Sequence, residues 1–356
     1  MNVNILLNPA NESWIIHKIA KNLTRELRHL DIKANISSEA DKRADIVHHM
    51  SWAFANIGTP QPSTMLVTHL DDIFKLNQVR STLLSGVSVG ICTSRETMRQ
   101  LLAHGCERKT LYFINLAHDG VIVPRRIVIG ITTRVYPDGR KREIVLQKVA
   151  RTMDLSAFEF QIFGKGWEPT IPYLETAGAV VRFFGESGDY LRDYDAIVKT
   201  VPNFDYYLYL GMDEGSLGTL DALAAGVPTI VTPQGFHLDL IGGITHPVIT
   251  EEDLQNVLQQ ISKNQRLRTN SVANLTWTSY AVRHLKLWES MLNRTTAPDQ
   301  QDDLMDHQPE NRAVDAYRKK ALLGNSLSLR RFLSSASHWR ALQPIRRLLD
   351  RHRINR

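Results

Sequence analysis

Short runs rich in β-branched and aromatic residues alternate with helical patterns along most of this chain, and the alternation starts twice. The first five runs fall at residues 3–7, 46–47, 65–68, 87–92 and 111–114, and the second five at 127–131, 158–163, 180–184, 206–210 and 229–231. Strands that alternate with helices build a mostly parallel sheet covered on both faces. The sequence therefore predicts an α/β fold of two Rossmann-like domains, with ligands beyond the carboxyl ends of the strands.

The segments between and after these two sets determine the predicted domain boundaries. Residues 118–126 carry the Gly, Pro and charges of a short linker, so we expect a first domain of residues 1–124 and a second of residues 125–275. Residues 276–292 predict a closing helix that packs through one face, formed by Trp277, Tyr280, His284, Leu287 and Trp288. The polar composition of residues 293–311 predicts a linker, and a basic amphipathic tail follows at residues 312–356.

The sequence shows no sign of export or of membrane insertion. Its two cysteines, Cys92 and Cys106, match neither a disulfide framework nor a paired metal-ligand spacing, which indicates a reducing compartment. The amino terminus lacks the features of a signal peptide. No window approaches the roughly 20 apolar residues that a membrane-spanning helix needs. We expect a cytoplasmic protein.

The positive charge of the chain is concentrated in the basic tail, residues 312–356. The tail holds twelve Lys or Arg residues and two Asp residues, whereas the whole chain has a net charge of +6, so the remainder is net acidic. This distribution argues against a nucleic-acid partner for the main body. Leu, Phe and Trp among the arginines are typical of a segment that lies on an anionic membrane, at ~1 kcal/mol per basic residue. A solvated terminus and docking on a partner protein are the alternatives.

The stretch from Tyr206 to Pro233 carries the most chemical information. It reads as an apolar strand, an acidic and Gly-rich turn, a helix, a Gly-Val-Pro break and another strand. Gly215 and Gly218 allow the backbone to approach a ligand, and the free N–H groups at a helix start suit a diphosphate. Asp221, inside the helix, is placed to accept hydrogen bonds from ribose hydroxyls.

This stretch resembles the signature of glycosyltransferase family 4 and its retaining GT-B relatives, an acidic pair followed by A-x-A-x-G-x-P. Asp213 and Asp221 keep the spacing of the pair, where the family usually has two glutamates. Glu214 followed by Gly215 matches the family's Glu-Gly dipeptide, so either Asp213 or Glu214 is the first acid. The resemblance implies that the first acid contacts the donor sugar and that Asp221 binds the ribose. It also places Gly215, Ser216 and Leu217 at the nucleotide.

Three further segments extend the resemblance to residues 1–292. Residues 127–150 are similar to the family's strand, Gly-Arg turn and lysine-bearing helix, which implies that Arg134 and Lys141 hold the donor diphosphate without a metal. Arg140 is the alternative to Lys141. Residues 160–185 are similar to the strand and G-x-G loop that place Gly164 and Gly166 beside the nucleotide base.

The third segment lies in the amino-terminal half, where ADIVHHM, STMLVTHLDD and SRETMRQLLAHGC resemble the family's D-x-V-H, T-x-H and S-x-x-x-x-x-L series. The resemblance implies that His69 faces the reacting sugar. The family's first loop is often Gly-Gly, whereas residues 8–14 here read Asn-Pro-Ala-Asn-Glu-Ser-Trp, and we expect Asn11 to Trp14 to shape the acceptor side.

The resemblance implies a GT-B glycosyltransferase whose two domains face each other across a cleft. The expected reaction is transfer of a hexose, with retention, from a nucleotide-sugar donor to a glycan or lipid-linked glycan of the cell envelope. No cofactor is expected, and the basic tail would place the enzyme at the inner face of the plasma membrane. The alternatives are a non-catalytic sugar-nucleotide-binding subunit and a GT-B epimerase. Taken alone, the acids could also be ordinary helix caps.

Overall fold

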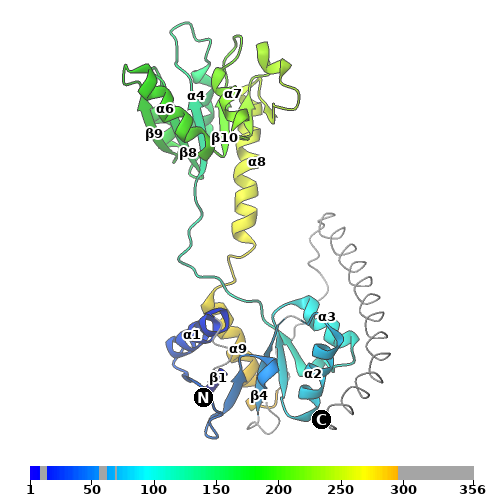
Figure 1. Ribbon diagram of the computed structural model, residues 1–356. Helices are drawn as coiled ribbons and strands as arrows, with labels where there is room; N and C mark the ends of the chain where they lie inside the picture. The colour runs from blue at the N-terminus through cyan, green and yellow to red at the C-terminus, as the bar shows by residue number, and fades with distance from the viewer. Residues whose placement is uncertain (9–13, 56–61, 69, 296–356) are drawn as a thin grey trace, which may run out of the picture. The chain divides into compact units, whose positions relative to one another are not determined.

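The computed structural model describes residues 1–8, 14–55, 62–68 and 70–295. By its internal contacts the chain divides into a unit of residues 1–285 and a second unit of residues 286–356. Within the first unit the described residues form two six-stranded parallel sheets with their helices (Figure 1). The predicted α/β fold of two Rossmann-like sheets is confirmed, and the cleft between them stays a prediction.

The first sheet has the strand order β2-β1-β3-β4-β5-β6, and all its neighbouring strands run parallel. Its strands are β1 (Asn2–Leu6), β2 (Lys33–Ser37), β3 (Ile46–His49), β4 (Ser63–Val67), β5 (Val89–Cys92) and β6 (Leu111–Phe113). Its helices are α1 (Trp14–His29), α2 (Ile73–Ser85) and α3 (Arg95–Ala103). Asp72 and Ser94 begin α2 and α3 by accepting a hydrogen bond from a first-turn N–H group with their side chains.

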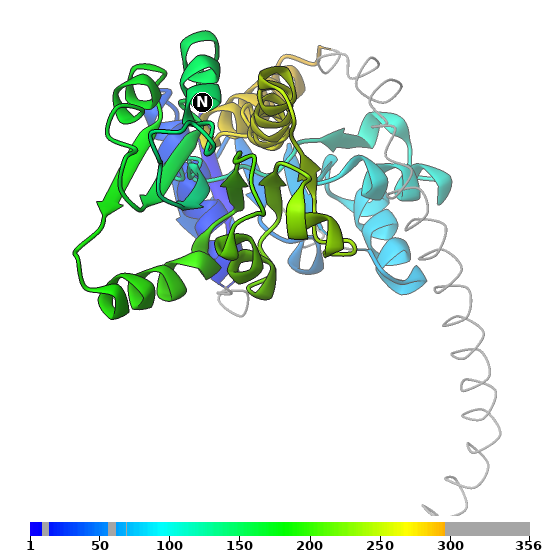
Figure 2. The same cartoon turned by 90° about the horizontal axis from the view of Figure 1, so that it is seen from above.

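The second sheet has the order β12-β11-β10-β7-β8-β9. Its strands are β7 (Ile127–Thr132), β8 (Phe158–Phe163), β9 (Val180–Gly185), β10 (Tyr206–Tyr209), β11 (Thr229–Val231) and β12 (His246–Pro247). Its helices are α4 (Glu143–Thr152), α5 (Ile171–Thr176), α6 (Tyr190–Thr200), α7 (Leu217–Ala224) and α8 (Glu251–Asn270), seen from above in Figure 2. The core joins apolar side chains of β7 and β8 to those of α4 and α8. Because β7 and β10 are neighbours, their carboxyl ends lie together at one edge.

All ten predicted runs form strands, whereas β2 and β12 were not predicted. β2 is an edge strand whose sequence, KANIS, buries only Ala34, so it needs no continuous apolar run. β12 has two residues and is recognisable only by its pairing with β11. Strands that bury little side-chain area leave little trace in a hydrophobic pattern.

Helix α9 (Trp277–Leu292) is the predicted closing helix, and its predicted face is buried throughout. Thr278 donates a hydrogen bond to Glu26 of α1 at 2.9 Å, and the His284 ring lies edge-on to His48 of β3 at 5.3 Å. The helix therefore packs beside α1 on the first sheet (Figure 1), although it follows the second sheet in sequence. No helix within the described ranges is both long and apolar enough to cross a membrane. Residues 296–356, which include the basic tail, lie outside the described residues.

Three buried histidines make the stability of the first sheet depend on pH. Burial lowers the pKa of His49 and of His284 to about 4, and it lowers the pKa of His48 well below 6.5. The folded chain therefore keeps these rings neutral at a pH where the unfolded chain protonates them. Their contribution is complete above about pH 6.5 and is lost as the pH falls towards 4, by roughly 1.4 kcal/mol per pH unit for each ring.

We expect the free energy of unfolding to fall steeply between about pH 7 and pH 5 in urea titrations. The variant His284→Gln removes one titrating ring and should flatten the slope. The control Leu84→Gln changes a residue of α2 that is 74% exposed and does not titrate, and it should leave the slope unchanged. Equal slopes in the wild type and in His284→Gln would contradict this account.

Candidate functional site

Four groups meet at the carboxyl edge of the second sheet, where the loops after β7 and β10 lie side by side. The ammonium group of Lys141 donates to Asp213 Oδ2 at 2.7 Å and to the Tyr209 hydroxyl oxygen at 2.8 Å. The Tyr209 hydroxyl and the Gly215 N–H both donate to the other carboxylate oxygen of Asp213. The side chains of Lys141 and Asp213 are 10% and 23% exposed, so the cluster is shielded but reachable.

The charges of this cluster follow from its hydrogen bonds. Burial alone would raise the pKa of Asp213, but the hydrogen bonds from Lys141 and Tyr209 outweigh it and hold the pKa below the ordinary 3.8. Burial, together with the neighbouring Asp213 carboxylate, raises the pKa of the Tyr209 phenol above its ordinary 10. Near neutral pH the cluster therefore joins a carboxylate to a neutral phenol. The Lys141 ammonium has three donors and uses two of them within the described part of the chain, which leaves one for a ligand.

Two glycines that follow β10 are required for different physical reasons. Gly215 has φ +115°, and a side chain there would approach the Phe236 ring to 2.8 Å. Gly218 lies in α7, where a Cβ would stand 2.0 Å from Thr132 Oγ1 and 2.4 Å from the Tyr207 hydroxyl. Gly218 is therefore required by the packing of α7 on the sheet, which is a different reason from the close approach to a ligand that we expected.

The acids of this loop do not cap α7. The N-cap residue of α7 is Ser216, whose hydroxyl lies 2.9 Å from the Tyr207 hydroxyl and makes no capping hydrogen bond. Asp213 bonds within the loop and to Lys141, whereas the exposed Glu214 contributes its backbone carbonyl, which accepts from Phe236 at 3.0 Å. Helix capping, the ordinary explanation for acids before a helix, therefore does not explain Asp213 or Glu214.

Asp221 lies in the second turn of α7 and is partly exposed. Burial is the largest cause of the raised pKa of the Tyr207 phenol. The Asp221 charge raises this pKa further, whereas the hydrogen bonds of the phenol lower it. Among the described residues, no side chain or backbone group forms a hydrogen bond or ion pair with the Asp221 carboxylate. It is therefore available to accept from a ligand hydroxyl.

Arg134 lies in the same loop as Lys141 but has a separate partner. It forms an ion pair with Glu186, just after β9, and its side chain is 53% exposed. Glu186 also accepts from the Lys165 N–H at 3.2 Å. Arg140 lies over the Tyr136 ring and pairs with Asp138. Of the three basic residues, Lys141 is the one that contacts Asp213.

Gly164 and Gly166 are explained by backbone packing between two loops. A Cβ on Gly164 would lie 2.7 Å from the Thr133 carbonyl oxygen, and one on Gly166 would lie 2.9 Å from that of Val135. Both glycines have positive φ, and the Trp167 indole N–H donates to the Thr133 carbonyl at 2.6 Å. These contacts fix the loop that carries Arg134, while a place beside a nucleotide base stays a prediction.

The carboxyl edge of the first sheet holds fewer described groups. His69 and Asn11 to Ser13 lie outside the described residues, and so does the side chain of Trp14. A cavity of about 40 Å³ lies between the ends of β1 and β3, beside His49 and Met50. This volume suffices for a water molecule but not for a sugar.

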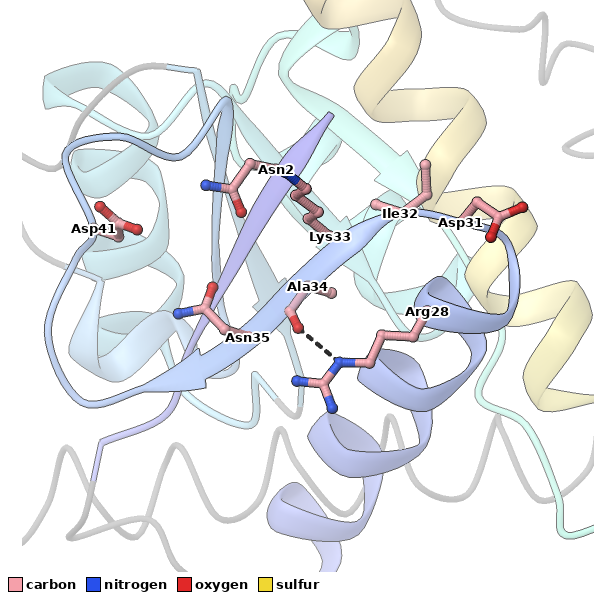
Figure 3. A pocket seen from close by; sticks show the side chains of 8 residues that line it. All are labelled: Asn2, Arg28, Asp31, Ile32, Lys33, Ala34, Asn35 and Asp41. Atoms are coloured by element: carbon pink, nitrogen blue, oxygen red, sulfur yellow. Dashed lines mark hydrogen bonds between the residues drawn. The ribbon is translucent and has the colours of Figure 1, made fainter.

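A larger hollow lies where β1 and β2 begin, at the opposite end of the first sheet (Figure 3). Two basic and two acidic side chains line it, and Arg28 donates from Nε to the Ala34 carbonyl at 2.9 Å. Ligands of parallel α/β sheets bind beyond the carboxyl ends of the strands. The hollow at the amino ends is therefore a poor candidate for the site that the motifs predict.

Sequence reasoning missed three residues that the structure brings to the second sheet's edge: Tyr209, Glu186 and His237. Tyr207 and Tyr209 are two residues apart in β10, so their side chains point to the same face of the sheet. They directly precede the acidic loop, residues 210–216. This spacing could have predicted that two hydroxyl groups lie beside the acidic loop. Glu186 and His237 reach their partners across separate loops, and no spacing in the sequence points to these contacts.

No family profile and no curated protein matches the sequence. Among solved structures, the chain is similar to HepE of Anabaena in complex with UDP and glucose, at 12% identity, covering 83% of this chain and 95% of that one, with a TM-score of 0.30. It is also similar to AviGT4, a glycosyltransferase involved in avilamycin A biosynthesis, at 14% identity, 84% and 100% coverage and a TM-score of 0.32. A third is the lipopolysaccharide outer core galactosyltransferase WaaB, at 14% identity, 79% and 97% coverage and 0.32. Likeness at this level assigns no activity.

The ion pair of the cluster can be measured by a double-mutant cycle with Lys141→Met and Asp213→Asn. Each single change leaves a shielded charge without its partner and should lower the free energy of unfolding by about 1–3 kcal/mol. The double variant should lose less than the sum, with a coupling of roughly 1–3 kcal/mol in urea titrations. Additive losses would mean that the pair contributes no coupling in solution.

Proposed function

We propose that this chain is a glycosyltransferase that moves a hexose from a nucleotide-sugar donor to a glycan or lipid-linked glycan acceptor of the cell envelope. The observation that carries the proposal is the cluster of Lys141, Asp213 and Tyr209 at the carboxyl edge of the second sheet. Asp221 follows it in α7 with an unengaged carboxylate. An ammonium, a carboxylate and a second acid in the following helix are the groups that a diphosphate, a sugar and a ribose would need.

The second sheet would hold the donor. The N–H groups of Leu217 and Gly218 precede the first backbone hydrogen bond of α7, which Thr219 donates to the Ser216 carbonyl at 2.9 Å, and they suit an anion. Lys141 would turn its remaining donor to the diphosphate, and Arg134 would exchange its surface partner Glu186 for a phosphate oxygen. In this arrangement Asp213 accepts hydrogen bonds from the sugar hydroxyls and Asp221 from the ribose hydroxyls.

The reaction proposed is transfer with retention, without a metal or another cofactor. The bond between the anomeric carbon and the diphosphate oxygen breaks as the acceptor hydroxyl oxygen bonds to the same face of that carbon. The acceptor proton passes to the departing diphosphate. Lys141 and Arg134 would stabilise the negative charge that grows on the leaving group.

The first sheet would bind the acceptor, with His69 facing the reacting sugar. A non-catalytic donor-binding subunit remains the second candidate, because Asp213 and Asp221 stand where the family usually has glutamates. The two candidates differ in a measurable way. An enzyme transfers the sugar to an acceptor, whereas the subunit binds the donor and leaves it intact. An epimerase would convert the donor with no acceptor present.

The donor site can be tested by thermal shift with UDP-, GDP-, dTDP- and ADP-sugars. One nucleotide class should raise the melting temperature of the wild type, since a ligand at 100 times its dissociation constant stabilises by about 2.7 kcal/mol. The variant Lys141→Ala should lose most of this shift. Lys148→Ala, which removes a 53% exposed lysine of α4, should keep it. An equal shift in Lys141→Ala and the wild type would contradict the role of Lys141.

The basic tail would hold the enzyme at the inner face of the plasma membrane. A chain ending at residue 311 should lose binding to vesicles that contain anionic phosphatidylglycerol, whereas neither form should bind pure phosphatidylcholine. Binding of the full chain should also weaken with added salt, because the attraction is electrostatic. Equal sedimentation of both forms with anionic vesicles would exclude the tail as the anchor.

A further inference from the structure

One buried imidazole ties the acidic loop after β10 to the end of β11. His237 is fully buried in the short 3₁₀ helix Gly235–Asp239. Its Nε2 lies 3.2 Å from the Ser216 backbone nitrogen, and its Nδ1 lies 3.0 Å from the Thr232 carbonyl oxygen. A backbone N–H can only donate and a carbonyl can only accept. The two contacts therefore assign a proton to Nδ1 and the role of acceptor to Nε2.

The segment that carries His237 contacts the acidic loop at successive residues. Gln234 donates from its side chain to the Asp213 carbonyl at 2.6 Å, and the Phe236 N–H donates to the Glu214 carbonyl at 3.0 Å. With the Ser216 contact, three backbone groups of the loop are held from one side. Gly235 permits this approach, because a Cβ there would stand 2.4 Å from the Glu214 carbonyl oxygen.

The His237 ring also supports the residue at the centre of the cluster. It lies edge-to-face with the Tyr209 ring, with 5.5 Å between centroids and an angle of 84°. Tyr209 in turn bonds both Lys141 and Asp213. One side chain thus contacts both the peptide at the start of α7 and the phenol beneath the charged pair.

We propose that His237 is a positioning residue for donor binding, which holds the Ser216 peptide so that Asp213 meets Lys141 and α7 offers its N–H groups from Leu217 on. Because Ser216 donates into the interior, its N–H is not available to a diphosphate. Losing the imidazole acceptor would free the Ser216 peptide to rotate and would disorder the anion site. This inference rests on the proposed function in naming the ligand as a nucleoside diphosphate.

The two hydrogen bonds of His237, to Ser216 and to Thr232, determine which variants test the proposal. We call these two hydrogen bonds the His237 bridge. In His237→Gln the side-chain amide oxygen can accept from Ser216 while the amide nitrogen donates to Thr232, so both hydrogen bonds can persist. His237→Phe keeps a planar ring against Tyr209 but removes both hydrogen bonds. His246→Gln is the matched control, because this ring lies in the same sheet and packs on Tyr206.

The affinity for UDP, GDP and ADP would be measured by calorimetry for each form. For the nucleotide that the wild type binds, His237→Gln should stay within about threefold and His237→Phe should weaken by about ten- to a hundredfold, because it leaves the buried Ser216 N–H and Thr232 carbonyl without their partner. His246→Gln should match the wild type. Equal affinity in His237→Phe and His237→Gln would overturn the proposal, and so would a loss of affinity in His246→Gln as large as that in His237→Phe.

Two measurements need no ligand and keep the proposal testable if His237→Phe does not fold. In protein labelled with ¹⁵N-histidine, the resonance that disappears in His237→Gln should show the Nδ1–H tautomer. The Ser216 amide should exchange slowly with solvent in the wild type and in His237→Gln. An Nε2–H tautomer or a fast-exchanging Ser216 amide would overturn the proposal. If these two results hold but no nucleotide binds the wild type, the proposed function fails, whereas the two hydrogen bonds of His237 are confirmed.

Discussion

The carboxylate of Asp213 is the group on which the arrangement of the site depends. Its pKa stays low despite burial because donors from two loops and a strand converge on it. Lys141 comes from the loop after β7, Tyr209 from the end of β10 and Gly215 from the loop that follows. These segments can meet because parallel neighbouring strands end at the same edge of a sheet. The topology of the second sheet thus fixes which charges come together.

Much of the fold could be predicted from the sequence, because buried parallel strands need continuous apolar runs. The buried face of α9 could be predicted for the same reason, since Tyr280 and His284 are spaced by one helical turn. β2 and β12 could not, because they bury almost no apolar area. A hydrophobic pattern reports burial, and strands held mainly by backbone pairing fall outside it.

Residues of the candidate site could be predicted where they stand in motifs that resemble those of a known family. Lys141 and Asp213 lie 72 residues apart, yet both were expected at one site because each stands in a segment that resembles a motif of the same glycosyltransferase family. The glycines show the limit of such reasoning. Gly164, Gly166 and Gly218 were assigned to ligand contacts, and each has a packing reason that only the fold shows. The role of His237 could not be predicted from the sequence, because it depends on contacts with two backbone groups that no sequence pattern indicates.

The place of α9 has a consequence for the order in which the protein is made. The helix contributes Tyr280 and His284 to the interior beneath the first sheet, although residues 127–247 of the second sheet intervene. During synthesis the second sheet leaves the ribosome complete, whereas the first sheet waits with an uncovered apolar face until α9 has emerged. The amino-terminal half is therefore the last to be finished, and a chain that stops before Trp277 would carry a complete second sheet and an incomplete first one.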